Sequence, residues 1–225
     1  MTPKEVRDFG LYAKDRGISS LNMHHFNKNI ENSLTPYILE ERQLNVTVMD
    51  VFSRLMMERI IWVAGVVNDQ MSTIVQAQLM FLDSTDHNDI TMHIDSPGGS
   101  VKSGLSMVDV MEYISSDIRT INTGMAASMG SVLLGAGTKG KRGSLRFSQT
   151  MLHQSSGGAV GNIQDAEISM IEWRKVNNIL FELLGGYCGK PAEQVKNDAT
   201  RDLWLDAEQA LSYGIIDEIV GKKKK

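Results

Sequence analysis

From Val51 onward, short apolar runs rich in β-branched residues alternate with longer segments in which apolar residues recur at helical spacing. The runs predict strands over residues 60–63, 90–94 and 118–123. The segments between them predict helices over residues 72–82 and 105–114. Strands that alternate with helices pair in parallel, with helices covering the sheet and functional groups at the strand ends. The pattern therefore predicts an α/β fold.

The C-terminal half predicts further elements. Small residues indicate a helix over 126–135, and an extended segment is expected over 144–153. A long helix is expected over 163–184, with apolar residues Ile168, Ile171, Val176, Ile179, Leu180 and Leu183. That helix is too long to lie wholly on one small sheet. Asp206 predicts the start of a short helix over 207–213, Gly214 its end, and residues 215–220 a closing strand.

The composition is that of a globular protein. Of 225 residues, 42% are hydrophobic and 22% charged, and the net charge is −4. This excludes intrinsic disorder, and no general positive field is available to attract nucleic acid or an acidic membrane. The polar residues 1–33 lack a sustained apolar period and are expected to form a detachable N-terminal extension, whereas residues 221–225 form a basic tail.

The cysteine content and the hydropathy of the sequence indicate in which cellular compartment the protein is expected. Cys188 is the single cysteine, so an internal disulfide is impossible, and no Cys/His spacing around it suggests a metal site. No apolar run approaches the roughly 18 residues of a membrane span. We therefore expect a cytoplasmic protein without metal or membrane association.

Two glycine-containing turns are candidate parts of a functional site. The first, Ser96-Pro97-Gly98-Gly99, follows a predicted strand and precedes a helix, where backbone N–H groups can point at an anion. Taken alone, this segment is better explained as an ordinary tight strand-to-helix turn, and a P-loop is excluded by spacing and by the missing lysine. The second turn, residues 124–130, places Ser128 between a strand and a helix, as a nucleophile requires; a helix-capping serine is the alternative.

A nucleophilic serine needs a base, and the chain has five histidines. His153 is the best placed, at the end of an extended apolar run, although the residue taken alone is better explained as a structural histidine. Asp198, Asp202 and Asp206 could each orient it. From the residues alone these three acids cannot be ranked.

Together, five ordered blocks resemble the proteolytic subunit of the Clp proteases. The resemblance runs from about Leu34 to Val220. His153 lies 25 residues after Ser128 and Asp202 lies 49 residues after His153, as in that family. The blocks are Ile94-Asp95-Ser96-Pro97-Gly98-Gly99, Gly124-Met125-Ala126-Ala127-Ser128-Met129-Gly130, Lys139-Gly140-Lys141-Arg142, Met151-Leu152-His153-Gln154 and Arg201-Asp202.

The resemblance implies a serine endopeptidase with the spiral α/β fold shared by Clp proteases and crotonases. It assigns Ser128 as nucleophile, His153 as general base and Asp202 as the acid that orients it. The N–H groups of Gly99 and Met129 are then expected to form the oxyanion hole. No metal ion or organic cofactor is required for this chemistry.

Domain organisation and partners are also implied by the resemblance. Residues 1–33 are expected to be a propeptide, residues 34–50 axial pore loops and residues 51–220 the peptidase domain. Residues 155–185 are expected to form a handle by which two heptameric rings stack. The resulting homo-oligomer would enclose the sites, so that unfolded polypeptides reach them only when a Clp-family AAA+ unfoldase supplies them.

This chain departs from the family pattern at a few positions. Ser155 stands where a proline usually follows His-Gln, and Asp95 where asparagine is common. Thr91 and His93 replace tyrosines of the pocket that receives unfoldase loops. Two alternatives are a crotonase-like acyl-CoA enzyme, which also uses backbone N–H groups as an oxyanion hole, and a non-catalytic ring subunit.

Overall fold

The computed structural model describes residues 37–42, 45–158 and 162–221. The chain divides into two units, Met1–Glu58 and Arg59–Lys225. In the first unit, β1 (Tyr37–Arg42) and β2 (Asn45–Asp50) form an antiparallel hairpin, followed by helix α3 (Val51–Met57). The Asp50 carboxylate caps α3 by accepting the N–H groups of Phe52 and Ser53. The extension predicted over residues 1–33 lies outside the described residues.

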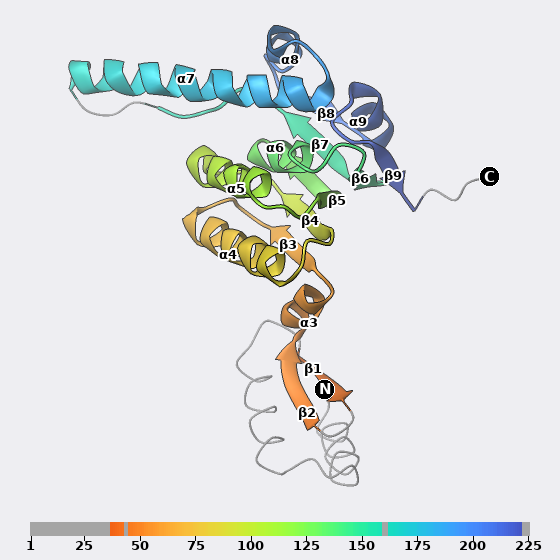
Figure 1. The fold of residues 1–225 in the computed structure, drawn as a ribbon. Coiled ribbons are helices and arrows are strands. Elements are labelled where there is room, and N and C mark those ends of the chain that lie inside the picture. The colour runs from red at the N-terminus through yellow and green to blue at the C-terminus, as the bar shows by residue number, and fades with distance from the viewer. Residues whose placement is uncertain (1–36, 43–44, 159–161, 222–225) are drawn as a thin grey trace, which may run out of the picture. The chain divides into compact units, whose positions relative to one another are not determined.

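The second unit is built on a seven-stranded sheet with the order β3-β4-β5-β6-β9 (Figure 1). These five strands are parallel, β7 pairs in parallel with the end of β5, and β8 runs antiparallel to β7. The expected α/β fold class is therefore confirmed. The strands are β3 (Ile60–Ala64), β4 (Ile90–Ser96), β5 (Ile118–Ala127), β6 (Arg142–Leu145), β7 (Gln149–Leu152), β8 (Leu203–Leu205) and β9 (Glu218–Val220).

Helices connect the parallel strands and cover the sheet (Figure 1). Ile61 and Val63 of β3 are buried whereas Trp62 between them is exposed, so this edge strand presents one covered and one open face. The described helices of this unit are α4 (Asp69–Thr85), α5 (Val101–Tyr113), α6 (Met129–Gly135), α7 (Ile163–Cys188), α8 (Ala192–Asp198) and α9 (Ala207–Tyr213).

The structure corrects three of the expected elements. The helix expected over 126–135 begins only at Met129, because β5 continues to Ala127 and pairs there with β7. The extended segment over 144–153 is two strands, since β6 pairs with the middle of β5 and β7 with its end. The strand expected over 215–220 is shortened to β9, and α8 and β8 were not predicted at all.

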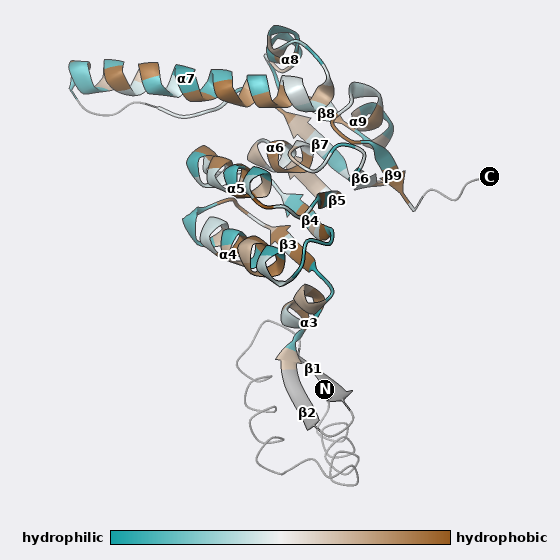
Figure 2. Ribbon diagram, viewed as in Figure 1, coloured by the Kyte–Doolittle hydropathy of each residue, from teal (hydrophilic) through white to brown (hydrophobic). Residues whose placement is uncertain are grey.

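Helix α7 is 26 residues long and projects beyond the sheet, as the sequence predicted (Figure 1). Its C-terminal part is anchored, since Leu180, Phe181 and Leu184 are buried. Its N-terminal part leaves Ile168 and Ile171 61% and 65% exposed, and Figure 2 shows hydrophobic residues recurring along this projecting part. Within the described ranges, neither α7 nor any other helix is long and apolar enough to cross a membrane.

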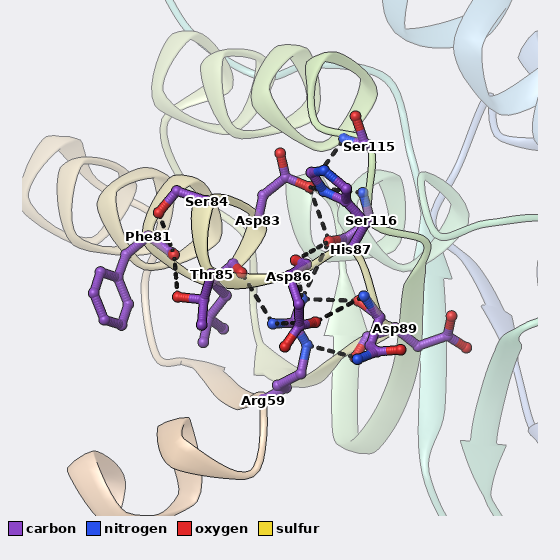
Figure 3. Close-up of polar contacts among 12 residues, drawn as sticks. Arg59, Phe81, Asp83, Ser84, Thr85, Asp86, His87, Asp89, Ser115 and Ser116 are labelled. Carbon is purple, nitrogen blue, oxygen red and sulfur yellow. Dashed lines mark hydrogen bonds and ion pairs between the residues drawn. The ribbon is translucent and has the colours of Figure 1, made fainter.

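Arg59 fixes the loop that leads from α4 into β4 (Figure 3). Its guanidinium donates to the carbonyl oxygens of Leu82 (2.9 Å) and Asn88 (2.8 Å) and to the Ser116 hydroxyl (3.1 Å). It also forms an ion pair with Asp86 at 3.0 Å. Arg59 has a left-handed φ of 60°, which is costly for a residue with a side chain, and these contacts hold it there.

A buried ion pair closes the other end of the sheet. The Arg142 guanidinium, 2% exposed, donates to both carboxylate oxygens of Asp217 at 2.7 and 2.6 Å and to the carbonyl oxygens of Tyr187 and Gly214. Burial opposes ionisation of Asp217, but the hydrogen bonds and charge of Arg142 outweigh it and hold the pKa of Asp217 below its usual value. This pair joins β6 to the ends of α7 and α9.

Candidate active site

Ser128 lies at the junction between β5 and α6. Its φ of 55° and ψ of −122° are unusual for a residue other than glycine, and its N–H donates to the Met151 carbonyl oxygen at 2.9 Å. The hydroxyl group does not cap α6, which rules out the capping alternative. The sharp junction also needs Gly130, where a Cβ would lie only 2.8 Å from the Ser96 carbonyl oxygen.

The hydroxyl of Ser128 instead contacts His153. The Ser128 Oγ and His153 Nε2 are 2.8 Å apart, and the imidazole is 23% exposed. The parallel pairing of Ala127 with Met151 places these two residues just beyond the ends of neighbouring strands. A proton on Nδ1 leaves Nε2 free to accept the hydroxyl proton, so the contact has the geometry of a nucleophile with its base.

Asp202 approaches the other side of the imidazole. Its Oδ1 is 3.4 Å from His153 Nδ1. Leu152 pairs with Leu203 across the antiparallel strands β7 and β8, so the next two residues outward are His153 and Asp202. The other two candidate acids are engaged elsewhere: Asp206 caps α9, and Asp198 accepts the Tyr213 hydroxyl at 2.9 Å.

The remaining described histidines lie away from Ser128. His87 is exposed and contacts Asp83 at 3.1 Å. His93, on β4, stacks on Trp62 with ring centroids 4.8 Å apart, and burial together with the Arg119 charge lowers its pKa. His24 and His25 fall outside the described residues.

The Ser96-Pro97-Gly98-Gly99 segment runs alongside Ser128. Val67 donates its N–H to the Gly98 carbonyl oxygen and accepts the Ser100 N–H, both at 2.8 Å, so Gly99 forms a parallel bridge with Val67. In such a bridge the N–H of Gly99 points away from Val67. A Cβ on Gly98 would lie 2.9 Å from the Met129 nitrogen, so the two candidate oxyanion-hole segments are in contact. The Met129 N–H belongs to the first turn of α6 and has no acceptor within that helix.

Ser96 and Asp95 belong to a motif noted in the sequence, but the sequence did not predict the contacts by which they hold this segment in place. The Ser96 hydroxyl accepts the Gly98 N–H at 3.1 Å and donates to the Gly65 carbonyl oxygen at 2.6 Å. Asp95 accepts the Met125 N–H at 3.0 Å, where the pairing of β4 with β5 shifts register. A serine two residues before a glycine is a signal for such a turn, whereas nothing local marks the partner of Asp95.

The described residues contain no group of three or more His, Cys, Asp or Glu side chains that could hold a metal ion. What they contain is a serine, a histidine and an aspartate in line, beside a backbone segment in which the Gly99 N–H points away from the paired residue Val67. On an α/β sheet with parallel strands, this arrangement is that of a serine hydrolase.

Comparison with known proteins narrows this class to one family. The family model described as Clp protease matches residues 42–223, so the chain belongs to the Clp protease family. The resemblance found in the sequence is confirmed, and the chain is a peptidase of that family.

Curated proteins of the same family are similar to this chain over nearly its whole length. The "ATP-dependent Clp protease proteolytic subunit" of Porphyromonas gingivalis is 46% identical over 222 residues, covering 98% of this chain and all of the relative. Two proteins of the same name from Bacteroides fragilis and Bacteroides thetaiotaomicron are 49% and 48% identical over 218 residues, each covering 96% of this chain and 99% of the relative. The match favours a peptidase over a crotonase-like enzyme.

Proposed function

We propose that this chain is a serine endopeptidase that hydrolyses peptide bonds of unfolded polypeptides, with Ser128, His153 and Asp202 as its catalytic residues. The observation that carries the assignment is the 2.8 Å contact between Ser128 Oγ and His153 Nε2 in a chain of the Clp protease family. The proximity of Asp202 to Nδ1 supports the third role.

In the first half of the reaction, Ser128 Oγ attacks the carbonyl carbon of the scissile peptide bond while His153 Nε2 takes the hydroxyl proton. Asp202 favours the tautomer with a proton on Nδ1 and stabilises the imidazolium that forms. The 3.4 Å separation is long for a charge-assisted hydrogen bond, and such contacts commonly tighten when substrate binds.

The tetrahedral intermediate carries its negative charge on the former carbonyl oxygen. The N–H groups of Gly99 and Met129 would donate to that oxygen, each contributing about 2.7–4 kcal/mol to transition-state stabilisation. The C–N bond then breaks and His153 returns its proton to the leaving amine. Water hydrolyses the acyl-enzyme ester by the same route, giving its proton to His153 and restoring the Ser128 hydroxyl.

The assembly belongs to the proposal as well. We infer that two heptameric rings stack through the projecting part of α7, because its exposed Ile168 and Ile171 would otherwise form an apolar patch in water. An ATP-dependent AAA+ unfoldase of the Clp type would supply unfolded chains to the enclosed sites, consistent with the name that the relatives carry. A cytoplasmic location fits this role.

The N-terminal assignments remain predictions. Residues 34–50, which include the hairpin of β1 and β2, are proposed as axial pore loops. Residues 1–33 are proposed as a propeptide that the assembled particle removes near Asn32 or Ser33. Mass spectrometry of the wild type and of Ser128→Ala decides the second point, since an extension kept by both proteins would make it a permanent part of the subunit.

The central experiment is titration with a fluorophosphonate, which reacts with an activated serine. The wild type should take up one label per subunit at Ser128 and hydrolyse short fluorogenic peptides. Ser128→Ala should do neither, while sedimentation shows unchanged assembly. Ser156→Ala, which changes an exposed serine near His153, is the matched control and should behave as wild type.

Two results would contradict the proposal. Peptide cleavage by Ser128→Ala at the wild-type rate would remove Ser128 from the mechanism. A wild-type protein that assembles yet takes up no label would instead be a non-catalytic ring subunit.

A further inference from the structure

Three side chains tie the segment after His153 to helix α7. The Ser155 N–H and the Ser155 hydroxyl both donate to Asn177 Oδ1 at 2.9 Å, and Trp173 Nε1 donates to Ser155 Oγ at 2.7 Å. Every hydrogen-bonding group of Ser155 except its carbonyl oxygen is therefore used within this cluster. We call Ser155, Trp173 and Asn177 the α7 clamp.

The chemistry of the donors fixes how the clamp is oriented. A backbone N–H can only donate, so the Asn177 amide must present its oxygen to Ser155, and that oxygen accepts two bonds with its two lone pairs. Trp173 and Asn177 are four residues apart and lie on the same side of α7. All three clamp residues are partly buried, whereas their neighbours on α7, such as Arg174 and Asn178, are exposed.

A second contact extends the clamp along the same segment. A Cβ on Gly157 would lie 3.2 Å from the Trp173 ring, so the backbone at this glycine passes close to the indole. The chain between His153 and Gly157 contributes no strand, and the clamp is what attaches it to a regular element. Its attachment point is two residues from the imidazole that contacts Ser128.

We propose that the α7 clamp positions His153 for proton transfer, so that Ser155, Trp173 and Asn177 are positioning residues of the active site. This inference rests on the proposed function and adds three positioning residues to it. At position 155 a proline would fix φ by its ring, whereas serine leaves the backbone freer. In this chain three hydrogen bonds to α7 take over that restraint.

The clamp also connects the catalytic base to the proposed ring contact. Trp173 follows Ile171 by two residues on α7, and its indole reaches Ser155. A displacement of the projecting helix therefore moves Ser155 with it, and His153 is two residues away. Proton transfer needs the Oγ–Nε2 contact within hydrogen-bond reach, so it is sensitive to small shifts of this segment.

The test compares Asn177→Leu with Asn177→Asp. Leucine has a similar size and cannot accept a hydrogen bond, whereas aspartate keeps the accepting oxygen. In the assembled enzyme, Asn177→Leu should lower kcat and the rate constant for fluorophosphonate labelling of Ser128 about tenfold, as loss of two hydrogen bonds allows. Asn177→Asp should restore most of both rates. Asn178→Leu, the same change on an exposed position, is the matched control and should leave them unchanged.

A double-mutant cycle with Ser155→Ala tests whether the clamp acts as a unit. Ser155→Ala should lower the labelling rate several-fold in the wild-type background and less in Asn177→Leu, because the acceptor of the Ser155 hydroxyl is then already absent and only the bond from Trp173 remains to be lost. If Asn177→Leu fails to assemble, Trp173→Phe replaces it. Phenylalanine keeps a ring against Gly157 but cannot donate, and about a threefold fall is expected.

The possible failures are distinguishable. An assembled Asn177→Leu enzyme that is labelled as fast as wild type overturns the positioning role, even if its melting temperature is lower. Equal rates for Asn177→Leu and Asn177→Asp, both reduced, also overturn it, because the accepting oxygen would then be irrelevant. Absence of labelling in the wild type would instead refute the proposed function.

Discussion

Gly98 lies so close to Ser128 that a Cβ on this glycine would be only 2.6 Å from the serine Cβ. The same atom would be 2.7 Å from the Ala127 carbonyl oxygen, and Gly98 has a left-handed φ of 92°. The backbone of one strand–helix turn therefore packs directly against Ser128, the proposed nucleophile, in the next turn. Only glycine allows that approach.

Gly98→Ala should consequently impair catalysis while leaving the protein folded. Relief of the contact moves either Ser128 or the Gly99 N–H, and a displacement of about 1 Å can lower kcat/KM about 100-fold. Peptide hydrolysis measures the loss. Gly186→Ala is the control, because a Cβ there meets nothing within 4 Å and alanine favours the helix. Comparable loss in both variants would show that the close approach is not the cause.

Asp202→Asn should retain only trace activity. Asparagine presents no charge to the imidazolium and can favour the wrong tautomer, an effect of about 10⁴-fold in kcat in a comparable triad. Asp206→Asn is a matched control, since asparagine caps a helix as well as aspartate does. If Asp202→Asn kept a substantial part of the wild-type kcat, a different group would be orienting His153.

Assembly is tested on two exposed apolar residues in the projecting part of α7, Ile168 and Ile171. Replacing Ile168 and Ile171 together with aspartate would bury unpaired carboxylates at any contact between these helices, a cost large enough to separate two rings. Sedimentation should show the particle halving in mass. Replacing Glu167 and Glu172 with glutamine alters neighbouring exposed positions without adding charge and should leave assembly unchanged. A double aspartate variant that stays fully assembled would place the ring contact elsewhere.

The Arg142–Asp217 pair should make stability depend on pH. Because the pKa of Asp217 is lowered on folding, its contribution is present above its usual value of 3.8 and is lost as pH falls through the folded-state pKa. Asp217→Asn leaves Arg142 buried without a counter-charge and should lower the free energy of unfolding by about 3 kcal/mol at pH 7. Chemical denaturation should show that difference shrinking below about pH 4. A difference that stays constant with pH would mean that the carboxylate charge contributes nothing.

Local sequence signals were sufficient for the elements that carry strong periodicity or a definite cap. The strands at residues 60 and 90 begin as predicted, and Asp206 caps α9 through a full capping box. The extent of β5 could not be predicted in this way, because its last residues are extended by pairing with β7 rather than by their own preference.

The same distinction applies to the candidate active site. Ser128 and His153 could be singled out from their positions after strands, but the three candidate acids are equivalent in the sequence. Only the register of β7 with the three-residue strand β8 brings Asp202 to the imidazole. So short a strand carries no periodicity of its own. The proposed role of Ser155 could not be predicted from the sequence either, because it depends on hydrogen bonds to side chains of a helix about 20 residues away.

Helix α7 leaves the sheet after β7 and the chain comes back as β8, so the whole projection is an insertion between two strands that pair with each other. The proposed catalytic residues His153 and Asp202 lie at the base of that insertion, whereas the part of α7 before Trp173 lies toward its tip. Whole helical turns could therefore be added to or removed from the tip without altering the register that aligns His153 with Asp202. If copies stack through α7 as proposed, the length of the projection would set the distance between them, and thus the volume of the space that they enclose, while the proposed catalytic residues would keep their arrangement.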